Sequence, residues 1–160
     1  MKAISYNPSS VGGLSNIYAI HVENFIKVAV NLQTKKKTVI VKDLNDVIEL
    51  PCFEDRSAYK EDESMEEAGK LYTIEINGFI PGNATDVITR RRLERGQWLV
   101  MHQDANGNVL LSGTQDNPLI FRSSRTSGGS RSASSGNSHS FYGATSAPSV
   151  CIDTAEIQEK

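Results

Sequence analysis

The amino-acid sequence predicts a mainly β fold, with antiparallel sheets that form a sandwich or a barrel and with one helix. Short runs of β-branched and aromatic residues recur along the chain, separated by clusters of asparagine, glycine and lysine. Only one segment, near residue 90, carries the cap and stop signals of a helix. A chain of 160 residues can bury one core of ordinary size, so residues 1–160 are expected to form a single domain.

The first third of the chain contains four predicted strands, and an acidic segment follows them. Asn45 and Asp46 form a plausible tight turn between the third and fourth strands. The acidic segment at 54–69 shows little apolar periodicity, so we interpret it as a solvated loop with at most one helical turn. The four strands are predicted at 17–19, 25–32, 38–42 and 47–50.

The clearest strand of the chain comes directly after the acidic segment. Ile74 and Ile76 share one of its faces, and Thr73 and Glu75 share the other. Gly78 interrupts this alternation and is interpreted as a candidate β-bulge. A Pro-Gly-Asn sequence then ends the strand.

The predicted helix carries the one dense basic cluster of the sequence. Its cap is expected at Asn83 or Thr85 and its stop at Gly96. The arginines have three interpretations: a solvated face near the helix C-terminus, a contact with the acidic segment of an adjacent subunit, or a contact with a nucleic-acid backbone. The candidate interface residues are Arg90, Arg91, Arg92 and Arg95 on the helix, and Glu61, Asp62, Glu63, Glu66 and Glu67 in the acidic segment.

Two further strands are predicted at 98–103 and 109–111. Asn106-Gly107 lies between them and is the strongest hairpin signal in the chain, because both residues accept the positive φ angles of a tight turn. Farther along, Ile120-Phe121 and Phe141-Tyr142 are short apolar anchors on either side of a polar segment.

Residues 123–140, SSRTSGGSRSASSGNSHS, have the composition of a flexible linker. Ordering these eighteen residues would cost about 18–36 kcal/mol, and few apolar side chains offset this cost. The segment is therefore either poorly ordered, or extended and clamped by strands or by neighbouring copies, and we favour an assembly. We predict a long Gly/Ser-rich hairpin at 122–141. Its candidate interface residues are Arg125, Gly128, Gly129 and Arg131.

Several classes of function find no support in the composition. A formal net charge of −2 predicts no general attraction to nucleic acid or acidic membranes. No run approaches the roughly eighteen apolar residues of a membrane span. His21, His102 and His139 share no ligand spacing with Cys52 or Cys151, which are interpreted as idle thiols. We therefore expect no catalytic residue, cofactor or metal, and no enzyme.

The second half of the chain can be described by the order of its predicted elements. A strand leads into the Asn-Gly hairpin, then into an element with Gly113, Thr114, Pro118, Leu119 and Phe121, then into the Gly/Ser segment and a closing aromatic strand. This order is similar to small structural proteins from the tail and neck gene modules of tailed bacteriophages and prophages of Bacteroidetes. The similarity covers roughly 70–150, and it departs from the family pattern at 136–140, where the family has an Arg-Asn-Gly-Tyr-like start.

The resemblance implies a virion structural protein that forms a symmetric ring or tube in a phage tail or neck. Tail-tube, ring and connector roles all remain open. The implied partners are copies of the chain itself and other tail or neck proteins, with passive DNA contact in a channel also compatible. Such a protein would be assembled in the host cytoplasm and located in the virion. The alternative is a non-viral β-sandwich binding module whose Gly/Ser loop contacts a ligand or partner.

Overall fold

The fold is mainly β, which confirms the predicted fold class. The computed structural model describes residues 12–52, 56–67, 69–81, 87–126, 135–154 and 156–160. Within these residues the strands are accompanied by one α-helix, α1 (Val87–Arg95), and by the short 3₁₀-helix η1 (Leu44–Asp46). The strands are β1 (Leu14–His21), β2 (Phe25–Val30), β3 (Lys37–Val41), β4 (Ile48–Pro51), β5 (Ala58–Glu66), β6 (Gly69–Pro81), β7 (Gln97–Asp104), β8 (Val109–Ser112), β9 (Leu119–Thr126), β10 (Gly136–Thr145), β11 (Val150–Ile152) and β12 (Ile157–Glu159).

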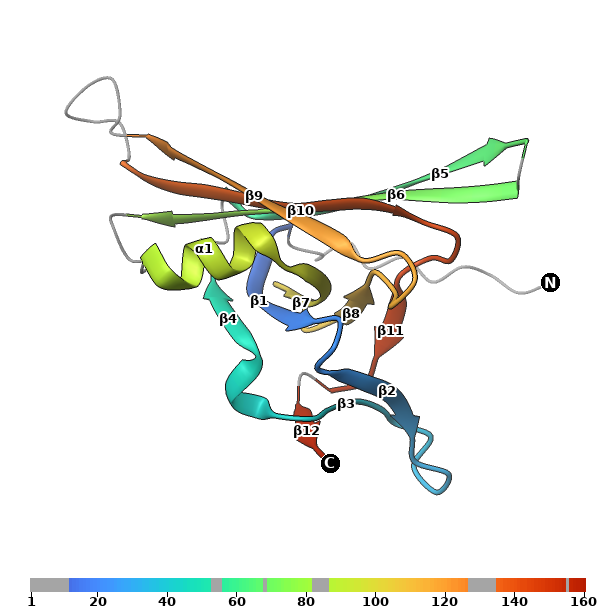
Figure 1. Cartoon of the computed structure of the whole chain (residues 1–160). Helices are drawn as coiled ribbons and strands as arrows, with labels where there is room; N and C mark the ends of the chain where they lie inside the picture. The colour runs from blue at the N-terminus through green and yellow to red at the C-terminus, as the bar shows by residue number, and fades with distance from the viewer. Residues whose placement is uncertain (1–11, 53–55, 68, 82–86, 127–134, 155) are drawn as a thin grey trace.

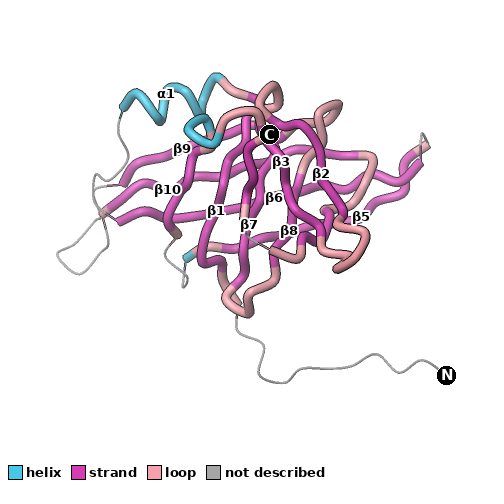
Figure 2. The backbone as a smooth tube through the Cα atoms, turned by 90° about the horizontal axis from the view of Figure 1, so that it is seen from below, coloured by secondary structure: helices cyan, strands magenta, loops and turns pink. Residues whose placement is uncertain are grey.

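The strands are arranged in three layers (Figure 1). The upper layer has the order β9-β10-β6-β5, and the middle layer has the order β4-β1-β7-β8-β11. These two layers belong to one sheet that divides at β7: Gln97 and Trp98 pair with β9, whereas the later residues of β7 pair with β8. The third layer is the separate sheet β12-β3-β2. Figure 2 shows the middle strands running across the direction of the upper strands.

Two apolar cores separate the layers, and β7 contributes to both. Trp98 and Val100 belong to the core beneath the upper layer, together with Phe141. Leu99 and Met101 belong to the core beside the three-stranded sheet. A strand that is buried on both faces has no polar alternation, which explains the continuous apolar run at the start of β7.

The strands on either side of the Gly/Ser segment form a long antiparallel pair. Gly136 lies opposite Thr126, and Phe141 lies opposite Phe121 with ring centroids 5.0 Å apart. Each predicted apolar anchor is a pair of residues, and in each pair the phenylalanine is the buried member. On its other edge β10 pairs with β6, so strands of the same chain hold part of the polar segment. Residues 127–134, with Gly128, Gly129 and Arg131, lie outside the described residues.

The acidic segment is not a loop, and the prediction for 54–69 was wrong over 58–66. These residues form β5, which pairs antiparallel with β6 from Ala58 opposite Asn77 to Glu66 opposite Gly69. The backbone of an edge strand can pair without covered side chains, so this strand needs no apolar alternation. Charged side chains on such an edge also discourage unwanted pairing with other chains.

The predicted Asn106-Gly107 hairpin is confirmed, but its turn differs from the expected type. β7 and β8 pair antiparallel on either side of it. Of the two residues only Gly107 has a positive φ, of 86°. The carboxylate of Asp104 accepts hydrogen bonds from the backbone N–H groups of Asn106 (2.9 Å) and Asn108 (2.8 Å). Local side-chain hydrogen bonds therefore stabilise a longer turn.

Gly78 does not mark a bulge, because β6 and β10 pair without a register shift. It provides space for His139, which lies directly opposite: a Cβ at Gly78 would be 2.3 Å from His139 Nε2. We therefore expect Gly78→Ala to lower the free energy of unfolding by about 1–3 kcal/mol, measured by urea denaturation. The same substitution in a His139→Ala background should cost much less. An equal cost in both backgrounds would show that the ring is not the obstacle.

Candidate functional site

The two predicted charge clusters lie at opposite ends of the upper layer. α1 lies beneath the layer, beside β9, toward one end, and the paired ends of β5 and β6 extend from the other end (Figure 1). Ser123 in β9 donates a hydrogen bond to Glu94 of α1 over 2.9 Å, which ties the helix to that end of the layer. The acidic and basic clusters of one chain therefore do not meet.

The acidic end of the layer is a projecting hairpin, which we call the acidic arm and define as residues 62–67 and 69–71. β10 pairs with β6 only from Tyr72 onward, so the arm extends past the end of β10 and is paired only with itself. Asp62 and Glu63 form exposed ion pairs with Lys60 and Lys70. Glu66 and Glu67 are exposed, and the side chain of Met65 between these charges is 74% exposed.

The basic end is α1, which buries only Leu93. The helix stops at Gly96 as predicted, and Trp98 fixes this end by donating its indole N–H to the Leu93 carbonyl over 2.9 Å. A Cβ at Gly96 would lie 2.4 Å from the Trp98 ring, so a glycine is needed there. Two apolar side chains of the helix, Val87 and Ile88, are exposed, and Ile88 is 77% accessible.

The four predicted arginines of α1 fall into two groups. Arg90 pairs with Glu94 on the helix, and Arg92 pairs with Asp46 of η1, both over 2.8 Å. Arg91 and Arg95 are exposed, and among the described residues neither forms an ion pair. Arg91 and Arg95 are therefore better candidates than Arg90 and Arg92 for contacts outside the chain.

Glu61 serves the fold rather than an external surface. Its Oε2 atom accepts hydrogen bonds from the Tyr59 hydroxyl (2.9 Å), the Ser149 backbone N–H (2.8 Å) and the Ser149 hydroxyl (2.7 Å). Partial burial opposes ionisation, but the hydrogen bonds from Ser149 and Tyr59 outweigh it and lower the pKa of the carboxyl group. Glu61 thus links the edge strand β5 to the segment before β11.

A buried histidine extends this network. His102 Nε2 is 3.1 Å from the Ser112 hydroxyl, which is in turn 2.8 Å from the Ser149 hydroxyl. His102 is only 2% exposed and Ser112 is fully buried, so a substrate cannot reach this serine. His102 is connected to the Glu61 carboxylate through the hydroxyl groups of two serines. In a catalytic triad the histidine instead forms a hydrogen bond with the carboxylate directly. The network is therefore structural, and burial lowers the pKa of His102 to about 4.

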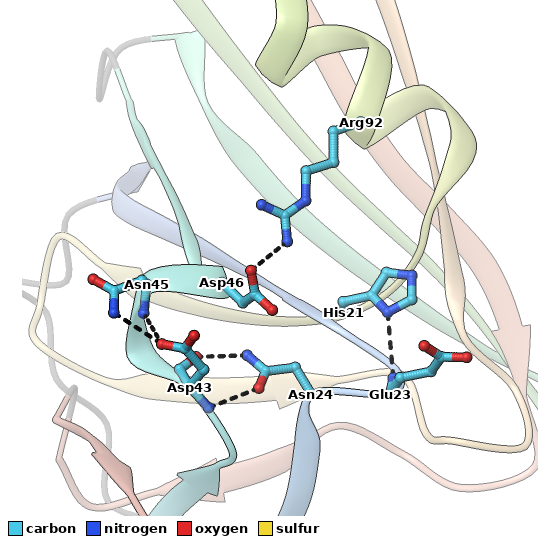
Figure 3. A network of polar contacts seen from close by, with 7 residues as sticks. All are labelled: His21, Glu23, Asn24, Asp43, Asn45, Asp46 and Arg92. Carbon is cyan, nitrogen blue, oxygen red and sulfur yellow. Dashed lines mark hydrogen bonds and ion pairs between the residues drawn. The ribbon is translucent and has the colours of Figure 1, made fainter.

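A polar pocket of about 600 Å³ lies between the end of α1, the β1–β2 turn and η1 (Figure 3). Asn24 donates its amide to the Asp43 carbonyl (2.8 Å) and accepts the Asp43 N–H (2.9 Å). Asp43 also caps η1 by accepting the Asn45 N–H over 2.8 Å, so the predicted turn at Asn45-Asp46 is a 3₁₀-helix. Side chains of both charge signs line the pocket: Glu23, Lys42, Asp43, Asp46, Arg92 and Arg95.

The described residues contain no group of three or more His, Cys, Asp or Glu side chains that could hold a metal ion. Cys52 and Cys151 are free thiols, and burial raises the pKa of Cys52 to about 11. Among the described helices, none has the length and apolar character needed to cross a membrane. No protein-family model, curated protein or solved structure matches the chain.

Proposed function

We propose that this protein is a virion structural subunit that assembles with copies of itself into a ring or tube in a phage tail or neck. The observation that carries this proposal is that the acidic arm projects from one end of the upper layer, whereas the basic helix α1 lies beneath the layer toward its other end (Figure 1). A contact between two different patches is heterologous, so repeating it closes a ring or continues a tube. The resemblance of the second half to phage tail and neck proteins supports the viral context.

Apolar side chains at both ends support the same contact. Met65 is exposed on the acidic arm, and Val87 and Ile88 are exposed on α1. Burying a large apolar side chain contributes about 1.5–3 kcal/mol, whereas an exposed ion pair contributes about 0–1 kcal/mol. In this arrangement the apolar residues supply affinity, and the opposite charges select the orientation of neighbouring subunits.

The proposal predicts that the purified chain forms closed rings or tubes as its concentration rises. Size-exclusion chromatography with light scattering gives the copy number, and negative-stain microscopy shows the shape. Met65→Ser and Ile88→Ser should each weaken assembly, because each removes apolar area from the contact. Leu32→Ser is the matched control, since Leu32 is an exposed apolar residue in the β2–β3 turn. A monomer at every concentration would instead favour the non-viral binding module.

A further inference from the structure

The open face of the upper layer contains a second feature, a groove of about 470 Å³. β6, β9 and β10 contribute residues to it. The upper layer has one face toward the middle layer and one face that points away from it (Figure 1). In β10, for example, Ser138 and Ser140 alternate with His139 and Phe141, which are buried on the inner side. We call this feature the arginine groove, and its principal lining side chains are Arg56, Asn77, Arg122, Ser124, Ser138 and Ser140.

Aromatic rings hold both arginines of this groove in place. The guanidinium carbon of Arg122 lies 4.2 Å from the centroid of the Tyr142 ring, and that of Arg56 lies 4.2 Å from the centroid of the Phe79 ring. Phe79 is buried although the strand alternation directs it to the open face. A guanidinium stacked on a ring keeps its N–H edge available for hydrogen bonds in the ring plane.

Among the described residues, the carboxylates near the arginine groove form no ion pair with these cations. Two carboxylates contact lining residues: Glu75 accepts from Asn77 over 3.0 Å, and Glu94 accepts from Ser123 over 2.9 Å. Across the described part of the chain, neither Arg56 nor Arg122 forms an ion pair with a carboxylate. The groove thus combines two oriented cations with serine hydroxyls that can donate.

We infer that the arginine groove binds a phosphate group, either as a free phosphate or as part of a nucleic-acid backbone. Arginine forks match the oxygen geometry of phosphate with paired N–H donors, and hydroxyl groups can satisfy further oxygens. The small side chains of Ser138 and Ser140 allow a ligand to approach the sheet closely. The inference does not depend on assembly, because one subunit contains all of these residues.

Two probes distinguish the two sources of phosphate. Inorganic phosphate is titrated by NMR while the amide signals of Ser138 and Ser140 are followed, and a fluorescent ten-nucleotide oligothymidylate is titrated by anisotropy. We expect at least one probe to bind. Binding of the oligonucleotide that weakens with added salt indicates a backbone site. Binding of inorganic phosphate without the oligonucleotide indicates a small phosphate ligand.

Substitutions test whether the groove is the site. Arg56→Gln and Arg122→Gln should each lower the affinity about tenfold or more, because each removes a charge-assisted contact. Arg122→Lys should not restore full affinity, because lysine lacks the planar fork. Lys36→Gln in the β2–β3 turn is the control with the same loss of charge and should leave the affinity unchanged. The inference is overturned if neither probe binds. It is also overturned if the Arg56→Gln and Arg122→Gln variants bind the probe as tightly as the unmodified protein does.

Discussion

Reversing the exposed charges of α1 should abolish assembly at low salt and leave the subunit folded. The variant is Arg91→Glu with Arg95→Glu, because these two arginines have no ion pair among the described residues. Reversing Arg90 or Arg92 would also break their pairs with Glu94 and Asp46 and would confuse folding with assembly. Like charges would then face each other across the proposed contact, which is unfavourable for that orientation. Light scattering should report monomers, and circular dichroism should report an unchanged fold.

A second reversal tests whether the acidic arm is the partner. Adding Glu66→Lys and Glu67→Lys to the reversed helix should restore part of the assembly, because the two patches are again opposite in sign. Glu61 is left intact because its hydrogen bonds to Ser149 and Tyr59 hold β5 in place. The control for the helix reversal is Lys35→Glu with Lys36→Glu, which makes a charge change of the same sign and size in the β2–β3 turn. If the arm reversal fails to rescue while the unmodified chain still assembles, α1 has another partner.

The sequence predicts those parts of the structure that depend on local pattern. The alternation around Ile74 and Ile76 locates β6, and Gly96 locates the end of α1. The acidic strand β5 has no such pattern, because its position depends on backbone pairing with β6 and on the distant contacts of Glu61. Contacts between residues that are distant in the chain also cannot be predicted from local pattern. Nothing near Glu61 indicates that Ser149 will donate two hydrogen bonds to it.

The buried histidines were missed for a similar reason. His102 follows an uninterrupted apolar run in β7, and this run was the one available signal of burial on both faces. His139 lies in a serine-rich segment with the composition of a linker, so no local feature indicates that it is buried. Its burial depends on Gly78, which lies opposite it in β6 and is remote in the sequence.

These two histidines should make the subunit strongly sensitive to acid. Burial lowers the pKa of His102 to about 4, against the opposing attraction of Asp104 and Glu61, and burial alone lowers that of His139 to about 4. Among the described side chains, His139 Nε2 is also a buried polar atom without a hydrogen-bond partner. In an unfolded chain a histidine has a pKa near 6.5, so between pH 6.5 and 4 the unfolded state binds more protons. The contribution of these two histidines to the free energy of unfolding is therefore fully present above pH 6.5, and it is lost as the pH falls toward 4.

At pH 5 each histidine should lower the free energy of unfolding by about 2 kcal/mol relative to neutral pH. The two losses together are a large fraction of the 5–15 kcal/mol that stabilises a typical domain. Urea unfolding of the monomeric subunit between pH 5 and 7 measures these losses, and the lowered pKa values of Glu61 and Asp104 move the titration of these carboxyl groups away from this range. His139→Phe keeps an aromatic ring beside Phe121 but cannot be protonated, so it should roughly halve the slope of stability against pH. His102→Gln, which preserves a hydrogen-bonding group toward Ser112, should remove the remaining half when it is combined with His139→Phe. A double variant that keeps the full slope would mean that the acid sensitivity has another origin, because no other buried histidine occurs among the described residues.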